Sequence, residues 1–528
     1  MTTESEGMII PGKLKWYVIL ALALWLAFSG VAAAEQLYVN ESGWWRDGGA
    51  FNVSETPIQA AVDAASEGDT IFVWNGSYSE NVDVDTAHLT LEGEGADVVT
   101  VTAADSDDHV FEVTADYVNI SGFTATGATG GRKAGIYLGS ADHRNISSNN
   151  ASKNYDGIRL YYSNCNTLEN NNANSNSDNG IFLKCLNNDN TLTGNIANSN
   201  NWHGISIGSL NNNTTLYNNT ANSNSRDGIF MEDSNGNTLQ NNTANLNNGN
   251  GVYLWNSSDN VLFSNTAMNS NNGHGIWLDS SSSNMLTNNI ASDNSNIGIG
   301  MWDSNGNTLH CNIANSNNGN GIYLNYSSGN TLQNNIATDS NNGHGISLSH
   351  SSNNMISDNA ASDNTYVGIG MWNSNGNTLL NNIANSNNDH GIRLYSSSSN
   401  TLLNNSANSN IYNGIYLSSS GSNTLQANTA NLNGDYGIRL YDSNSNVLTS
   451  NTANLNNDHG IYLSSSSSNI LSSNIANLNN NYGIYLSSSN YNALQSNTAN
   501  LNNDHGIRLY DSNSNSILSK LIGKRGII

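Results

Sequence analysis

Aromatic and arginine side chains recur at one position of a repeated Gly-Ile-x-Leu motif, where x is the variable residue. Of the 17 residues at position x, nine are aromatic and four are arginine. A row of exposed rings can stack on the apolar faces of pyranose sugars, and the planar guanidinium group of arginine can pair with uronate or sulfate groups. The pattern therefore predicts a glycan-binding row formed by Phe230, Tyr253, Trp277, Tyr323, Arg393, Tyr416, Arg439, Tyr462, Tyr485 and Arg508. The alternative is that these side chains only stabilise the strands that carry them, because aromatic residues favour strands and interact across them.

Two carboxylates on the same predicted strands are the candidates for catalysis. Glu232 and Asp279 are expected two coils apart, at about 10 Å, and glycoside hydrolysis needs two carboxylates within about 5–10 Å. A polysaccharide lyase or glycoside hydrolase acting on this face is therefore the alternative to a binding protein. Asp233 begins a "DSNGN" sequence that imitates half of a calcium loop, but Ala244 stands where that loop needs glutamate. Calcium thus stays possible without a complete motif, and we predict no cofactor.

Histidines that precede the glycine of the motif do not predict a metal site. They are His203, His274, His344, His390, His459 and His505. Most are expected two or three coils apart, whereas the ligands of one metal must converge on a single point. Asn, Tyr and Asp occupy the same position in other copies, which favours a role in the turn. Cys165, Cys185 and Cys311 show no CxxC spacing, so we predict no metal ligands.

A repeat of about 23 residues must position all of these side chains. The motif glycine recurs at intervals of 22 to 24 residues from Gly135 to Gly506, and nearly the same 19 residues begin at Asn428 and again at Asn497, three periods later. Within a period, short alternating apolar groups such as Ile461 and Leu463 are separated by Asn, Ser and Gly, which is typical of short strands joined by turns. No segment keeps a helical period, and a propeller blade needs about 40 residues. The sequence therefore predicts an all-β fold, a parallel β-helix (solenoid) of about 20 coils with three strands per coil.

Asparagine and glycine are expected to shape the turns of each coil. Asparagine tolerates the left-handed backbone conformation, and identical amides stacked on successive coils can form hydrogen-bonded ladders. Glycine before isoleucine is expected where a Cβ atom would clash with a neighbouring part of the coil.

The first part of the chain differs from the repeat. Residues 1–34 are predicted to be a signal peptide, because Lys13 and Lys15 precede an apolar run and a small-residue cleavage site. Residues 35–130 are predicted to form an amino-terminal cap and irregular first coils. There, Thr56, Pro57 and Gln59 match a capping box that begins a short helix, which can plug the first coil.

The remainder divides into residues 131–517, the predicted regular array, and residues 518–528, an atypical tail. The tail contains Lys520, Lys524 and Arg525, and either guards the edge of the sheets or reflects a truncation. The net charge of −25 argues against nucleic acid and anionic lipid as partners. No second apolar run of spanning length follows the signal peptide, so we expect no membrane span after its cleavage and a secreted protein, extracellular or at the cell surface.

The segments "YVNESGWWRDGGAFNVSETPIQAAV" and "GDTIFVWNGSYSENV", together with the repeated coils, carry a family resemblance. The chain resembles secreted right-handed β-helix repeat proteins of the pectin-lyase-like superfamily, and specifically NosD-like archaeal cell-surface proteins, from about residue 36 to residue 517. The resemblance implies right-handed coiling and an extracellular setting. It leaves the function open, because the superfamily includes lyases, glycosidases, adhesins and structural proteins. We expect a binding or structural role, with polysaccharide or cell-envelope glycan and other surface-layer proteins as partners.

Overall fold

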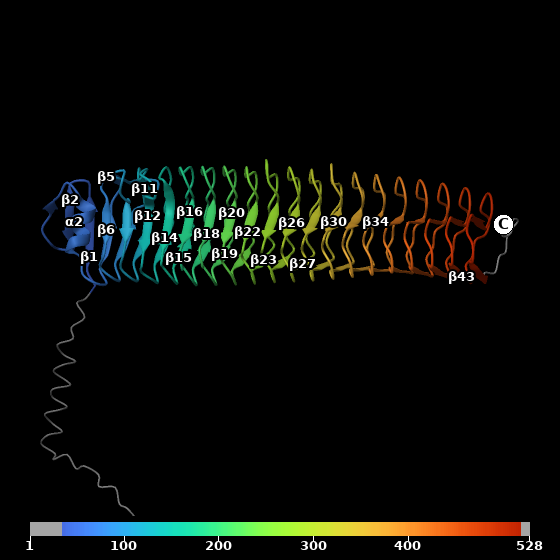
Figure 1. Ribbon diagram of the computed structural model, residues 1–528. Helices are drawn as coiled ribbons and strands as arrows, with labels where there is room; N and C mark the ends of the chain where they lie inside the picture. The colour runs from blue at the N-terminus through green and yellow to red at the C-terminus, as the bar shows by residue number, and fades with distance from the viewer. Residues whose placement is uncertain (1–33, 519–528) are drawn as a thin grey trace, which may run out of the picture.

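The protein is a straight rod of stacked coils (Figure 1). The computed structural model describes residues 34–518. The predicted signal peptide and tail lie almost entirely outside these residues. Each regular coil contributes one strand to sheet C, one strand to sheet A and a single bridged residue on the third side. In the part of the chain that the structure describes, no helix is both long and apolar enough to cross a membrane.

Sheet C runs along the rod and carries the Gly-Ile-x-Leu motif. Its strands pair in parallel, each with the strand of the next coil. They are β6 (Val82–Val84), β9 (Phe111–Val113), β12 (Ala134–Gly139), β14 (Asp156–Tyr161), β16 (Ile181–Lys184), β18 (Ile205–Gly208), β20 (Ile229–Glu232), β22 (Val252–Trp255), β24 (Ile276–Asp279), β26 (Ile299–Trp302), β28 (Ile322–Asn325), β30 (Ile346–Ser349), β32 (Ile369–Trp372), β34 (Ile392–Tyr395), β36 (Ile415–Ser418), β38 (Ile438–Tyr441), β40 (Ile461–Ser464), β42 (Ile484–Ser487) and β44 (Ile507–Tyr510).

Sheet A forms a second side of the rod and is antiparallel only among its first three strands. Its strands are β1 (Gln36–Asn40), β2 (Gly43–Arg46), β3 (Asn52–Val53), β4 (Thr70–Val73), β7 (Thr90–Gly93), β10 (Asn119–Ser121), β13 (Asn145–Ser147), β15 (Thr167–Glu169), β17 (Thr191–Thr193), β19 (Thr215–Tyr217), β21 (Thr238–Gln240), β23 (Val261–Phe263), β25 (Met285–Thr287), β27 (Thr308–His310), β29 (Thr331–Gln333), β31 (Met355–Ser357), β33 (Thr378–Leu380), β35 (Thr401–Leu403), β37 (Thr424–Gln426), β39 (Val447–Thr449), β41 (Ile470–Ser472), β43 (Ala493–Gln495) and β45 (Ser516–Leu518). The third side begins as sheet B, with β5 (Gly76–Ser79), β8 (Val99–Thr102) and β11 (Thr124–Thr126). It continues as single bridged residues up to Thr498.

Helix α2 (Pro57–Ala64) lies at the amino-terminal end of the rod (Figure 1). Its Ile58 and Ala61 side chains are fully buried and join the core of the first coils. The predicted capping box is wrong, because Thr56 makes no side-chain hydrogen bond to the helix. Instead, the carboxylate of Glu80 accepts hydrogen bonds from the backbone N–H groups of Ile58 (3.1 Å) and Gln59 (2.9 Å). A residue from the connection between β5 and β6 therefore satisfies free donors at this helix terminus.

The core of the array is built from four apolar residues per coil. In one coil these are Ile461 and Leu463 of β40, Leu471 of β41 and Ala476 on the third side, all fully buried. The predicted alternation is confirmed, since Ile and Leu of the motif point inward. One coil cannot cover these side chains, and its neighbours complete the core.

Buried asparagines form hydrogen-bonded ladders at the corners of the coils. The side-chain oxygen of Asn474 accepts hydrogen bonds from the backbone N–H (2.9 Å) and the amide group (3.0 Å) of Asn451, one coil earlier. The Asn451 amide group also donates to the carbonyl of Leu425 at 2.8 Å. The predicted ladders are thus present. The left-handed positions are nevertheless the residues just before the ladder, such as Ser468 (φ 59°) before Asn469 and Leu478 (φ 57°) before Asn479.

The motif position requires glycine because neighbouring parts of the coils leave no space for a Cβ atom there. A Cβ atom on Gly460 would come within 2.7 Å of the Cβ atom of Ala476 and of the carbonyl oxygen of Gly483. This agrees with the prediction for the glycine before isoleucine. The predicted fold class is confirmed as a parallel β-solenoid of about 20 coils with about 23 residues per coil and one short helix near the amino terminus.

Candidate functional site

The outward side chains of sheet C form two parallel rows along the rod. The second residue of each regular four-residue strand, which is position x of the motif, faces outward and forms the central row. The fourth residue also faces outward and forms what we call the edge row. Strand pairing keeps both rows in register, since Tyr253 pairs with Trp277 in the central row and Trp255 pairs with Asp279 in the edge row. Neighbouring members of a row are therefore about 4.8 Å apart.

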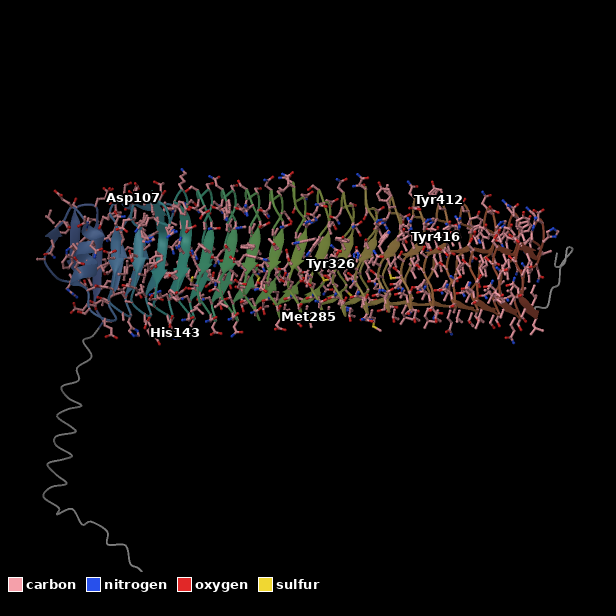
Figure 2. The ribbon with its side chains drawn as sticks, in the orientation of Figure 1. Asp107, His143, Met285, Tyr326, Tyr412 and Tyr416 are labelled. Atoms are coloured by element: carbon pink, nitrogen blue, oxygen red, sulfur yellow. The ribbon has the colours of Figure 1, made fainter. Side chains whose placement is uncertain are left out.

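The central row contains all ten residues that the sequence predicts for glycan binding. The structure places them on one face in consecutive or nearly consecutive coils, and all ten are half-buried. Tyr416 lies on this face of the rod, with Tyr412 closer to its upper edge (Figure 2). The half-burial has a local cause, because the side chains of the row cover one another.

Rings and guanidinium groups of the central row stack on their neighbours. Tyr462 and Tyr485 lie parallel, with ring centres 5.0 Å apart and an interplanar angle of 5°, so each covers one face of the other. The guanidinium carbon of Arg439 lies 5.3 Å from the ring centres of both Tyr416 and Tyr436. Its Nε atom is buried with no hydrogen-bond partner among the described residues. Such cation–π contacts stabilise the row internally, as the alternative reading of the row expects.

Histidines from the turn that precedes the sheet C strands stack on rings of the central row. The ring of His274 stacks on Trp277 at 4.2 Å, and the ring of His203 stacks on Phe230 at 4.7 Å. The Nδ1 atom of His274 accepts a hydrogen bond from the backbone N–H of Ile297, one coil later, at 3.2 Å. Burial lowers the pKa of His274 to about 4, so this ring is neutral at physiological pH. The turn role predicted for these histidines agrees with this geometry.

The edge row carries the most exposed rings of sheet C, and the sequence analysis missed it. Trp255, Trp302, Tyr395 and Tyr441 are 42–44% exposed, and Tyr510 in the last strand of sheet C is 58% exposed. Continuing the alternation by one residue beyond the Leu of the motif would have found them, because an inward Leu is followed by an outward residue. Small residues in the central row make space for some of these rings. A Cβ atom on Gly370 would lie 2.2 Å from the indole of Trp372.

A shallow pocket of about 340 Å³ opens on this face where the central row contains small residues. Its lining includes Ser347, Ser349, Tyr323, His344 and Trp372. The pocket is a local widening between aromatic side chains of this face.

The two candidate catalytic carboxylates both lie in the edge row. Glu232 pairs with Trp255, and Trp255 pairs with Asp279, so the two acids are two coils apart at about 10 Å. The exposed indole of Trp255 stands between them. Burial and the nearby Asp233 raise the pKa of Glu232. Among residues 34–518, no three His, Cys, Asp or Glu side chains are grouped as they would be around a metal ion.

Comparison with known proteins identifies a family by sequence. The model of the family described as "Right handed beta helix region" matches residues 104–267, 256–384, 310–453 and 367–522. A search of the curated proteins gave no match.

Solved structures with a related fold include enzymes and an adhesin. The periplasmic alginate epimerase AlgG (T265N mutant) is 10% identical, with 85% of this chain and 79% of that chain covered and a TM-score of 0.34. An alginate lyase from a Paenibacillus strain is 14% identical, with 52% and 92% covered and a TM-score of 0.34. PfbA, a surface adhesin of Streptococcus pneumoniae, is 11% identical, with 65% and 88% covered and a TM-score of 0.35. Similarity at this level supports neither a ligand nor an activity for the chain.

Proposed function

The chain belongs to the right-handed β-helix family, and we propose that its sheet C face binds a polysaccharide laid along the rod. The observation that carries this proposal is the edge row of exposed rings. Trp255 and Trp302 are two coils apart, about 10 Å, and so are Tyr395 and Tyr441. This spacing is close to the length of a disaccharide unit in an extended β-1,4-linked chain. Successive rings can therefore meet sugar units that present the same face.

The central row supports the edge row in this proposal. Stacked neighbours fix the positions of Tyr416, Arg439 and Tyr462, so the face is rigid before a ligand arrives. A preformed face lowers the entropy that binding costs. Aligned exposed aromatic side chains are a feature of interaction sites, which supports this proposal.

Affinity electrophoresis in gels that contain neutral β-1,4-linked glucans or mannans tests the proposal. Substitution of both Trp255 and Trp302 by Ala is expected to weaken retention about tenfold or more, which corresponds to about 1.4 kcal/mol or more. The matched control is Tyr491→Asn, because Tyr491 is 69% exposed, lies outside sheet C and has a positive φ that Asn tolerates. A second variant, Tyr462→Ala with Tyr485→Ala, measures the contribution of the central row. Equal retention of the tryptophan double variant and the wild type would refute the edge row as the binding surface.

Incubation of the protein with the same polysaccharides in solution tests the enzymatic alternative. A lyase would release unsaturated products and a hydrolase would release new reducing ends. If products form and disappear in Glu232→Gln and Asp279→Asn, the face is catalytic rather than a binding surface. Retention without products supports the binding role.

The predicted leader at residues 1–34 supports a place of action outside the cell. We propose a secreted protein that acts extracellularly or at the cell surface, where cell-envelope glycan is accessible and other surface-layer proteins are neighbours. Amino-terminal sequencing of chain recovered from the medium is expected to begin at Glu35, and an intact leader would contradict export by this route.

A further inference from the structure

A cavity of about 440 Å³ lies where the irregular first coils meet the regular array. Strands β9, β12, β14 and β16 form its floor. It is lined by His109, Glu112, Gly131, Arg132, Lys133, Tyr137, Arg159, Tyr161 and Lys184. Tyr137 and Tyr161 are half-buried rings from neighbouring strands. The lining thus combines four cationic side chains with two aromatic rings.

Positive charge is concentrated at this cavity against the overall charge of the chain. Residues 34–518 contain eleven Lys and Arg residues, and four of them line the cavity, while the net charge of the protein is −25.

Among the described residues, two of the four cations form intramolecular ion pairs and two do not, although the ammonium group of Lys184 lies 5.9 Å from the ring centre of Phe182. Arg159 pairs with the buried carboxylate of Asp156 at 2.8 Å, and Lys133 pairs with Asp108 at 3.1 Å. Neither Arg132 nor Lys184 forms an ion pair with a described residue. Glu112 is the one carboxylate in the lining, so the lining residues themselves carry more positive than negative charge, with Asp83 beside Glu112 on the preceding strand.

The edge row leads directly into the cavity. Along consecutive coils the row reads Tyr161, Lys184, Gly208, Glu232 and Trp255, each paired in register with the next. A polymer that stacks on Trp302 and Trp255 and continues towards the amino terminus would therefore pass Glu232 and then Gly208, which has no side chain of its own, and end at Lys184 and Tyr161.

We propose that this cavity is a subsite for an anionic sugar unit, one that carries a carboxylate or a sulfate group. The guanidinium group of Arg132 and the ammonium group of Lys184 bind the anionic oxygens through charge-assisted hydrogen bonds. The rings of Tyr137 and Tyr161 contact the sugar, and Glu112 accepts hydrogen bonds from its hydroxyl groups. The inference rests on the proposed function, because the edge row brings the polymer to the cavity.

Matched pairs of polymers separate charge from sugar shape. The first pair is a glucuronate polymer and the same polymer after reduction of its carboxylates to neutral hydroxymethyl groups. The second pair is dextran sulfate and dextran. For each pair, the ratio of the two dissociation constants is measured by isothermal titration calorimetry at low salt and at 0.5 M NaCl. The wild-type protein is expected to prefer one acidic polymer about tenfold or more, and the pair that shows the preference identifies the anionic group.

The test variant is Arg132→Asn with Lys184→Gln, and the control is Lys153→Asn with Arg226→Gln. Arg132 (φ 70°) and Lys153 (φ 62°) are both exposed and left-handed, so asparagine suits both positions. The two double variants change the net charge equally. We expect the test variant to lose the acidic preference and to bind the neutral polymer as the wild type does, while the control keeps the preference.

Three results would overturn the proposal. They are an unchanged ratio in the test variant, an equal loss in both double variants, and the absence of any acidic preference in the wild type. These outcomes are distinct from failure of the proposed function, in which neutral polymers bind equally well to the wild type and to the Trp255→Ala, Trp302→Ala variant. If no polymer binds the wild type, both proposals are wrong.

Discussion

At the scale of single residues, the histidines of the turn before sheet C, except His505, act as acceptors that join successive coils. The Nδ1 atom of His344 accepts from the backbone N–H of Val367 at 3.1 Å, as His274 does from Ile297. Asparagine does the same work in other coils, since the side-chain oxygen of Asn320 accepts from the N–H of His344 at 2.9 Å. A protonated imidazole has two N–H donors and no acceptor. Protonation would therefore break this bond as well as place a charge in a desolvated position.

Acidification is expected to destabilise the protein through these histidines. Burial lowers the pKa of both His274 and His344 to about 4, whereas an unfolded histidine titrates near 6.5. Below pH 6.5 the unfolded state binds more protons than the folded state, so stability falls as the pH decreases towards 4 and the loss levels off below that. Each histidine contributes up to about 3 kcal/mol to this loss.

The variant His274→Asn with His344→Asn keeps an acceptor and removes the titration. Urea unfolding at pH 7.5 and pH 4.5 measures the difference. We expect similar midpoints for variant and wild type at pH 7.5, and a smaller loss at pH 4.5 in the variant. The carboxylates are common to both proteins, so an equal loss would show that these histidines do not titrate below their usual pKa.

At the scale of elements, the unit of the fold is one coil, because the strand pairings and core contacts across a coil interface recur one period later. Ile438 pairs with Ile461 and Ile461 pairs with Ile484 in sheet C, while Leu448 pairs with Leu471 in sheet A. The asparagine ladders keep the same step. An insertion or deletion of whole coils therefore preserves each type of contact, which explains how the 19-residue segment at Asn428 can recur at Asn497.

Deletion of residues 437–459 is expected to give a folded rod one coil shorter. Tyr436 then precedes Gly460, and the new interface repeats the old one. Deletion of residues 437–448 removes about half a coil and is expected to unfold the following coils, because inward and outward residues no longer match. Circular dichroism reports folding, and small-angle X-ray scattering should show a rod shorter by about 4.8 Å. If both deletion variants fold, or both unfold, the coil is not the unit of stability.

At the scale of the whole molecule, the sequence predicted what repeats and missed what is set by contacts between distant parts of the chain. The period and the alternation of residues such as Ile461 and Leu463 are local features, and they predicted the solenoid and its core. The capping of helix α2 by Glu80 depends on a residue more than 20 positions later. The exposure of the edge row depends on which side chains cover the central row, as the ring of His274 covers Trp277. The cationic cavity likewise brings together Arg132 and Lys184, which lie two coils apart. No short sequence motif predicts such a cavity.

The length of the rod makes binding depend on the length of the ligand. Seventeen regular coils extend about 80 Å, and the edge row from Trp255 to Tyr441 covers eight coil steps, or about 38 Å. A short oligosaccharide touches one or two rings, whereas a longer one touches several at once, and each further contact forms at a high effective concentration. Affinity for a series of β-1,4-linked oligosaccharides is therefore expected to rise about 10²–10⁴-fold with length. It should level off once the ligand exceeds the row. Substitution of Trp302 by Ala, in the row, should flatten the rise, and Tyr491→Asn, outside it, should not. Affinity that stays constant with length would limit binding to a single pocket and would contradict an extended face.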